Sequence, residues 1–107
     1  MSYFETATEG YDLTPSQRRA LQRFFRDAES TRITLDDFGY HITIGSLAYP
    51  SEFSLEDAIE ELQGLLFRRM LPYGLPPAVV VVAEGDNSWV VDMSHAVAET
   101  RYSLEYL

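Results

Sequence analysis

The sequence predicts an α+β fold in which two helices pack on an antiparallel sheet. Two hairpin patterns, at residues 32–44 and 78–93, supply the strands of that sheet. Two further segments, which start after Thr14 and Ser54, begin with a capping hydroxyl and repeat apolar residues at helical spacing. The resulting element order, (β)αββαβββ, permits a ferredoxin-like core that carries an extra C-terminal hairpin.

The valine-rich hairpin is expected at the centre of the sheet. Residues 78–83 contain four consecutive valines, whose β-branched side chains are stiff at χ1 and fit a pleated strand better than a helix. A four-residue turn at 84–87 would pair Val82 with Trp89. The strand is apolar on both faces, whereas the two helices can cover only one face. We therefore expect a second copy of the chain to cover the other face, which predicts a homodimer.

The N-terminal third is predicted to hold a short strand and a long helix. Residues 2–8 alternate weakly in polarity, which favours an edge strand. Thr14 supplies a hydroxyl cap, Pro15 suits the first helical position, and Gln17 lies three residues after the cap. The helix then runs to about Glu29 and gathers its apolar residues on one face, namely Ala20, Leu21, Phe24, Phe25 and Ala28.

The hairpin at residues 32–44 has a register that both of its strands support. Their alternation about a four-residue turn puts Ile33 opposite Ile42 on an apolar face and Thr34 opposite His41 on a polar face. Because a slip of one residue would exchange the two faces in one strand only, this agreement fixes the register.

The second helix begins after Ser54, with an acidic residue three positions on, at Asp57. Its apolar arc runs as far as Met70, but Phe67 falls on the polar flank. Tyr73 lies in the proline-bounded segment that follows. We expect Phe67 and Tyr73 to form an exposed contact site.

The C-terminal residues admit two interpretations. Residues 98–107 alternate strictly between apolar and polar side chains, which favours a strand. The alternative is an amphipathic helix capped by Ser94.

Length and composition narrow the class of protein. A chain of 107 residues suits a single domain that spans residues 1–107. The absence of cysteine excludes a disulfide framework, a thiol nucleophile and a thiolate metal site. No apolar run approaches the ~20 residues of a membrane span, and the N-terminus lacks the pattern of a signal peptide. We expect a cytoplasmic protein with no membrane association, no cofactor and no metal.

The charge is strongly one-sided. The formal net charge is −9, and every basic residue is an arginine. Such a lysine-free, acidic composition is typical of a GC-rich genome or of a salt-adapted, halophilic cytoplasm. The alternative is an acidic surface that imitates nucleic acid or docks on a basic partner. A negative field repels phosphates, so nucleic-acid binding is not expected.

An arginine stripe on the first helix is the main candidate for binding. It consists of Arg19, Arg23 and Arg26, with Arg18 beside it. Positive charge is unfavourable at a helix N-terminus, where Arg18 and Arg19 stand. Two explanations remain open, and the first is a set of salt bridges to the acids of the second helix, Glu56, Glu60 and Glu61. The second explanation is contact with an acidic partner or an anionic ligand.

A second candidate for ligand binding is the polar face of the 32–44 hairpin, where Arg32 and His41 lie. Catalysis has weaker support, because phosphate loops, metal-ligand spacings and nucleophile elbows are all missing. His41, Asp92 and His95 have the residue types of a hydrolase, although nothing in the sequence brings them together.

Three functions follow, in order of preference. The first is a small acidic protein-interaction or regulatory module without catalysis of its own. The second is a small-molecule or anion-binding domain that uses the arginine stripe or the face with Arg32 and His41. The third is a small hydrolase-like enzyme.

Overall fold

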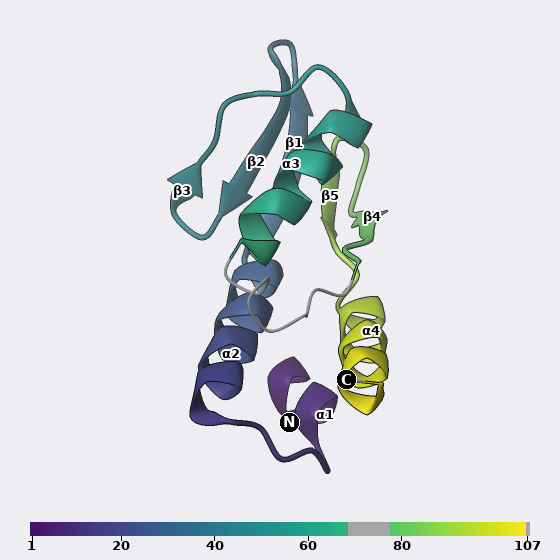
Figure 1. The fold of residues 1–107 in the computed structure, drawn as a ribbon. Coiled ribbons are helices and arrows are strands. Elements are labelled where there is room, and N and C mark those ends of the chain that lie inside the picture. Colours follow the sequence, from purple (N-terminus) through teal and green to yellow (C-terminus); the bar gives the residue numbers. More distant parts are fainter. Residues whose placement is uncertain (69–77, 107) are drawn as a thin grey trace.

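The computed structural model describes residues 1–68 and 78–106 (Figure 1). These residues form four helices and one five-stranded antiparallel sheet, which confirms the predicted α+β class. In chain order the elements are α1 (Tyr3–Thr8), α2 (Pro15–Glu29), β1 (Thr31–Asp36), β2 (Gly39–Ile44), β3 (Leu47–Ala48), α3 (Leu55–Phe67), β4 (Val81–Ala83), β5 (Ser88–Val91) and α4 (Met93–Glu105).

Strand β1 lies at the centre of the sheet, whose order is β3-β2-β1-β5-β4. The predicted register of the first hairpin is confirmed, because Ile33 pairs with Ile42 and Thr34 pairs with His41. Ile33 and Ile42 are fully buried in the same hydrophobic cluster as Leu62 of α3. Figure 1 shows α3 lying across this face of the sheet. The opposite, open face holds the polar side chains of the hairpin.

The valine hairpin is at the edge of the sheet and not at its centre, so the predicted position is wrong. Its turn is also one residue shorter than expected, because the Glu84 N–H donates to the Ser88 carbonyl oxygen at 2.7 Å. Gly85 supplies the positive φ of 94° that this tighter turn needs. Val82 therefore pairs with Val90 in place of Trp89. The shift of one residue turns Val82 to the open face, where it is 42% exposed.

Residues 2–8 form a helix and not the expected edge strand. The Ser2 hydroxyl accepts the Glu5 backbone N–H at 3.1 Å and so caps α1. Thr6 and Thr8 also bond to carbonyls one turn earlier in the chain. A ferredoxin-like core needs a strand before its first long helix, and α1 occupies that place.

The C-terminal residues form α4, so the strand that their alternation favoured is wrong and the helical alternative is observed. The cap is the Asp92 carboxylate, which accepts the His95 N–H at 3.1 Å, and not Ser94. Ala96 and Thr100, four residues apart on one face of α4, are both buried. Residues two apart lie on nearly opposite sides of a helix, so the alternating set divides into the buried Thr100 and the exposed Tyr102 and Tyr106.

Helices α1 and α4 lie side by side and are joined by Arg101 (Figure 1). Its guanidinium donates from Nη1 to the carbonyl oxygens of Thr6 and Glu9, each at 3.0 Å. These carbonyls belong to the end of α1, which has no further turn to satisfy them. The Tyr11 hydroxyl adds a hydrogen bond of 2.7 Å to the carboxylate of Glu105.

Helix α2 has the predicted bounds and the predicted capping box between Thr14 and Gln17. Its apolar face supplies both buried phenylalanines of the core, and four residues of this face are buried: Leu21, Phe24, Phe25 and Ala28. The core therefore continues from the sheet into the helical end of the molecule.

Thr100 gives a test of this core. Its side chain is fully buried, and its hydroxyl has no hydrogen-bond partner among the described residues. Thr100→Val keeps the shape and removes an unpaired polar group, so we expect the free energy of unfolding in urea to rise by about 1 kcal/mol. Thr100→Ser is the control, because it keeps the hydroxyl and loses a buried methyl group. A Val variant that is less stable than the parent would show that the hydroxyl is paired.

Candidate functional site

One stretch of the chain carries only negative formal charge. Between Arg32 and Arg68 there is no arginine, while seven acids occur there, namely Asp36, Asp37, Glu52, Glu56, Asp57, Glu60 and Glu61. The fold places most of this stretch at one end of the molecule, away from both chain ends (Figure 1).

Two loops are tied together at that end. Tyr40 and Glu52 exchange backbone hydrogen bonds of 3.0 and 2.8 Å. A Cβ atom at Gly39 would lie 2.7 Å from the Glu52 carbonyl oxygen, so glycine permits this close approach. The β4–β5 turn reaches the same end, because the Leu35 N–H donates to the Asn87 carbonyl oxygen at 2.9 Å.

Two phenylalanine side chains near these acids are exposed to solvent. Phe38 is 85% exposed and Phe53 is 99% exposed. Neither lies on a loose backbone: the Phe38 N–H donates to the Asp36 carboxylate at 2.7 Å, and Phe53 stands between the Glu52 bridge and the Ser54 cap. We call this surface the acidic pole and define it by Asp36, Asp37, Phe38, Glu52, Phe53, Glu56, Asp57 and Asp86.

Sequence reasoning missed both phenylalanines, although the chain holds a signal. An aromatic residue inside a two-residue turn has no strand face through which to be buried, and one directly before a helix cap is buried only if it packs back on the first turn of the helix. Phe38 has the first position and Phe53 the second. What the sequence could not show is that the two segments adjoin.

His41 lies beside the acidic pole and bonds to one of its acids. Its Nε2 atom is 2.7 Å from Oδ1 of Asp36. This hydrogen bond, together with that from the Phe38 N–H, lowers the pKa of Asp36 below its ordinary value. The Nε2 atom of His41 is thus engaged by a carboxylate and is not free to bind an anionic ligand.

The structure does not bring the three candidate catalytic residues together. Asp92 caps α4, and the His95 ring lies 3.9 Å from the Glu99 carboxylate. Among the described residues, no hydrogen bond or ion pair joins His41 to Asp92 or to His95. Nor do the described residues contain a group of three side chains that could hold a metal ion. The hydrolase-like alternative therefore gains no support from geometry.

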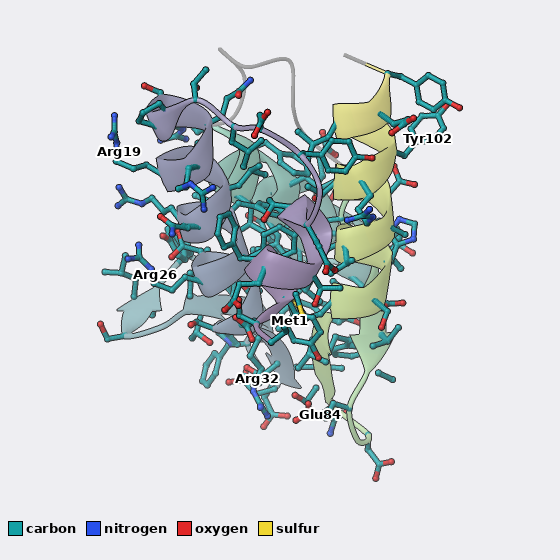
Figure 2. All side chains as sticks on the ribbon, turned by 90° about the horizontal axis from the view of Figure 1, so that it is seen from below. Met1, Arg19, Arg26, Arg32, Glu84 and Tyr102 are labelled. Atoms are coloured by element: carbon teal, nitrogen blue, oxygen red, sulfur yellow. The ribbon has the colours of Figure 1, made fainter. Side chains whose placement is uncertain are left out.

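The arginine stripe makes its contacts within α2 and with α1. Arg23 and Arg26 approach Asp27 at 3.9 and 3.5 Å. Arg19 donates to the Ser16 hydroxyl at 3.4 Å, and the Arg18 guanidinium lies 5.8 Å from the centre of the Phe4 ring. None of the salt bridges in the described residues joins the stripe to Glu56, Glu60 or Glu61, so that explanation is wrong. Figure 2 shows Arg19 and Arg26 on the outer side of α2.

A cavity of about 530 Å³ adjoins the C-terminal half of this stripe. It lies between α2, the turn from β2 to β3, and the end of α3. Three arginines line it, namely Arg23, Arg26 and Arg68, and Asp27 is the only acid among the described lining residues. Most of the other lining residues are apolar, among them Phe24, Ile44, Tyr49, Leu65 and Leu66, and Ser30 and Ser46 also line the cavity.

The second arginine candidate is already neutralised. Arg32 forms a salt bridge of 3.0 Å with Glu84 on the open face of the sheet (Figure 2). The cavity beside it, of about 660 Å³, is also lined by Glu29 and Asp92. An anion would meet more negative than positive charge there, so the face with Arg32 and His41 is the poorer anion site.

Phe67 is not an exposed contact residue. It is partly buried, and its ring stacks on that of Phe24 with the centroids 5.9 Å apart and the planes 17° apart. The flank of α3 that the sequence assigns to water packs against α2, which a pattern within one helix does not show. Tyr73 lies outside the described residues.

The hydrogen bond between His41 and Asp36 predicts how the pKa of Asp36 responds to a change at residue 41. His41→Asn should raise the pKa of Asp36 toward its ordinary value, as measured by NMR of the Asp36 carboxyl carbon. Because the pKa of Asp36 is lower in the folded state than in the unfolded state, the ionised carboxylate stabilises the fold above about pH 4. This contribution to the free energy of unfolding is lost as the pH falls below that value. His95→Asn is the control and should leave Asp36 unchanged. An unaltered Asp36 in the His41 variant would show that the imidazole does not hold the carboxylate.

Comparisons with known proteins do not identify the chain. No family model, curated protein or solved structure matches it. None of the helices in the described residues has the length and apolar character needed to cross a membrane.

Proposed function

We propose that this chain is a protein-interaction module without catalysis of its own, and that the acidic pole docks on a partner protein. The partner would present basic side chains around an apolar cleft. The observation that carries the proposal is the exposure of Phe38 and Phe53, at 85% and 99%, on the acidic pole.

The two rings supply the energy of such a contact. Removing an exposed phenylalanine side chain from water contributes about 1.5–3 kcal/mol. Aromatic residues are enriched at the centres of protein interfaces, where a few side chains carry most of the affinity. The Phe38 N–H is bonded to Asp36, and Phe53 lies between Glu52 and Ser54, whose backbone groups are both hydrogen-bonded, so binding would order little besides the two side chains.

The carboxylates supply selectivity. Acids around an apolar centre attract a basic surface, raise the rate of encounter and repel acidic surfaces. Nucleic acids and the anionic faces of membranes are both negative, so the same charges oppose them. A basic protein in the cytoplasm is the partner that fits this chemistry.

The open sheet face favours a second contact, between two copies of the chain. Val80 and Val82 are 40% and 42% exposed there, beside the half-buried Val90. We propose that a second copy of the chain covers these valines. The resulting dimer would present two acidic poles. This contact lies on the sheet and is independent of the two phenylalanines.

The dimer is tested by sedimentation equilibrium at micromolar concentration. We expect the parent chain to form a dimer and the double variant Val80→Thr, Val82→Thr to dissociate at least ten-fold more readily. Threonine keeps the β-branched shape and loses a buried methyl group at each position. A parent chain that stays monomeric across this range would contradict the dimer and leave the acidic pole unaffected.

The acidic pole is tested with the double variant Phe38→Gln, Phe53→Gln. A partner captured by the parent chain, identified by mass spectrometry and purified, should bind the variant roughly 100-fold more weakly or worse, because two central aromatic contacts are lost. The melting temperature should not change, since both rings are exposed. Binding by the parent should weaken as salt is added.

Tyr102→Gln is the matched control, because Tyr102 is an exposed aromatic residue on α4 (Figure 2). It should bind the partner like the parent chain. If the Phe38/Phe53 variant bound as tightly as Tyr102→Gln, the acidic pole would not be the docking surface.

A further inference from the structure

We infer that the cavity between α2, the β2–β3 turn and α3 binds an organic anion, with a carboxylate or phosphate head and an apolar body. This site is separate from the acidic pole and goes beyond the proposed protein contact. Three arginines would hold the head, and the apolar walls would enclose the body.

The cavity has the size and the walls of a small-molecule site. Its volume of about 530 Å³ falls within the range of ligand pockets, which is roughly 300–1,000 Å³. Phe24 and Leu66 belong to the buried core, so the inner wall is part of a packed surface. Such a wall keeps its shape whether or not a ligand is present.

The charge of the cavity is opposite to that of the whole chain. Among the described lining residues, Arg23, Arg26 and Arg68 stand against the one acid Asp27, in a protein with a formal net charge of −9. The side chains of Arg23 and Arg26 are 48% and 68% exposed, and both approach the same carboxylate at 3.5 Å or more. A guanidinium carries five N–H donors, so Asp27 leaves most of these donors free.

The helix ends account for only part of this arrangement. Both α2 and α3 end at the cavity. Arg26 and Arg68 lie at the C-terminal ends of these helices, where the helix dipole stabilises positive charge. Arg23 lies earlier in α2, outside its last turn. A helix dipole also does not require a hollow with an apolar wall beneath the arginines. Arginines at the rim of an apolar hollow are the combination that an amphiphilic anion needs.

Arginine favours particular head groups. Its planar fork binds a carboxylate or a phosphate through two parallel N–H bonds. Carboxylate and phosphate heads share this chemistry, and the experiment separates them. A neutral alcohol with the same body would gain the apolar contacts and none of the charged ones.

The test is calorimetric titration of the full chain with four probes: decanoate, decyl phosphate, decanol and inorganic phosphate. The two amphiphilic anions are kept below their micelle concentrations and decanol below its solubility limit. We expect at least one of the two amphiphilic anions to bind ten-fold or more tightly than decanol, and more tightly than inorganic phosphate. Decanoate and decyl phosphate then show which head is preferred. Failure of both anions to bind at millimolar concentration would overturn the site, and so would decanol binding equally well.

Variants locate the binding. Arg23→Gln, Arg26→Gln and Arg68→Gln together should weaken the preferred anion at least ten-fold and leave decanol unchanged. Arg19→Gln is the matched control, since it removes a charge from α2 outside the cavity. Equal losses in the triple variant and in the control would mean that the anion senses the charge of α2 and not the cavity.

Failure of this site is distinguishable from failure of the proposed function. The Phe38→Gln, Phe53→Gln variant should bind the anion like the parent chain, because neither ring lines the cavity. Loss of anion binding in that variant would contradict the inference that the cavity and the acidic pole are separate sites. If the triple arginine variant instead bound the anion normally and changed the sedimentation of the chain, the arginines would belong to a contact between copies.

Discussion

The pairing of β1 with a strand on each side is the constraint on which the rest of the structure depends. Ile33 lies opposite Ile42 of β2 and opposite Trp89 of β5, and it is fully buried. Because both edges of β1 are occupied, the valine strand β4 can join only at the outside, next to β5. The same pairing sets the two faces of the sheet, since α3 covers the face that carries Ile33 (Figure 1). The open face, the position of the valines and the place of the cavities all follow from it.

Much of the fold was predictable where the signal is local. The Thr14 cap, the Ser54 cap and the hairpin of β1 and β2 were predicted with their bounds or register, because each is decided by residues close in sequence. The errors arose where a short segment alternates in polarity and yet folds as a helix, as in α1 and α4, or where one backbone hydrogen bond shifts a turn, as at Glu84. Phe67 was misplaced for a third reason, which is that packing between helices decides which flank meets water.

The candidate sites were predictable in composition but not in assembly. The sequence shows the arginines of α2 and the acids between Arg32 and Arg68. It does not show that Arg68 returns to the side of Arg23 and Arg26, which depends on how α3 lies against α2. It also does not show that Phe38 and Phe53 stand at one end, because the contact of Gly39 with Glu52 joins two loops. Sites of this kind are built by tertiary contacts between segments whose own sequences look ordinary.

The link between α1 and α4 bears on the order in which the chain folds. The hydrogen bonds of Arg101 to Thr6 and Glu9 span 95 and 92 positions of the sequence, whereas those of the β1–β2 hairpin join residues no farther apart than Thr31 and Ile44. Closing a long loop costs more chain entropy than closing a short one, so contacts of this span tend to form after local ones. Opening them would release α1 and the end of α4 without breaking a strand pairing. The two ends of the chain would then form a cooperative unit that exchanges its amide protons before the sheet does.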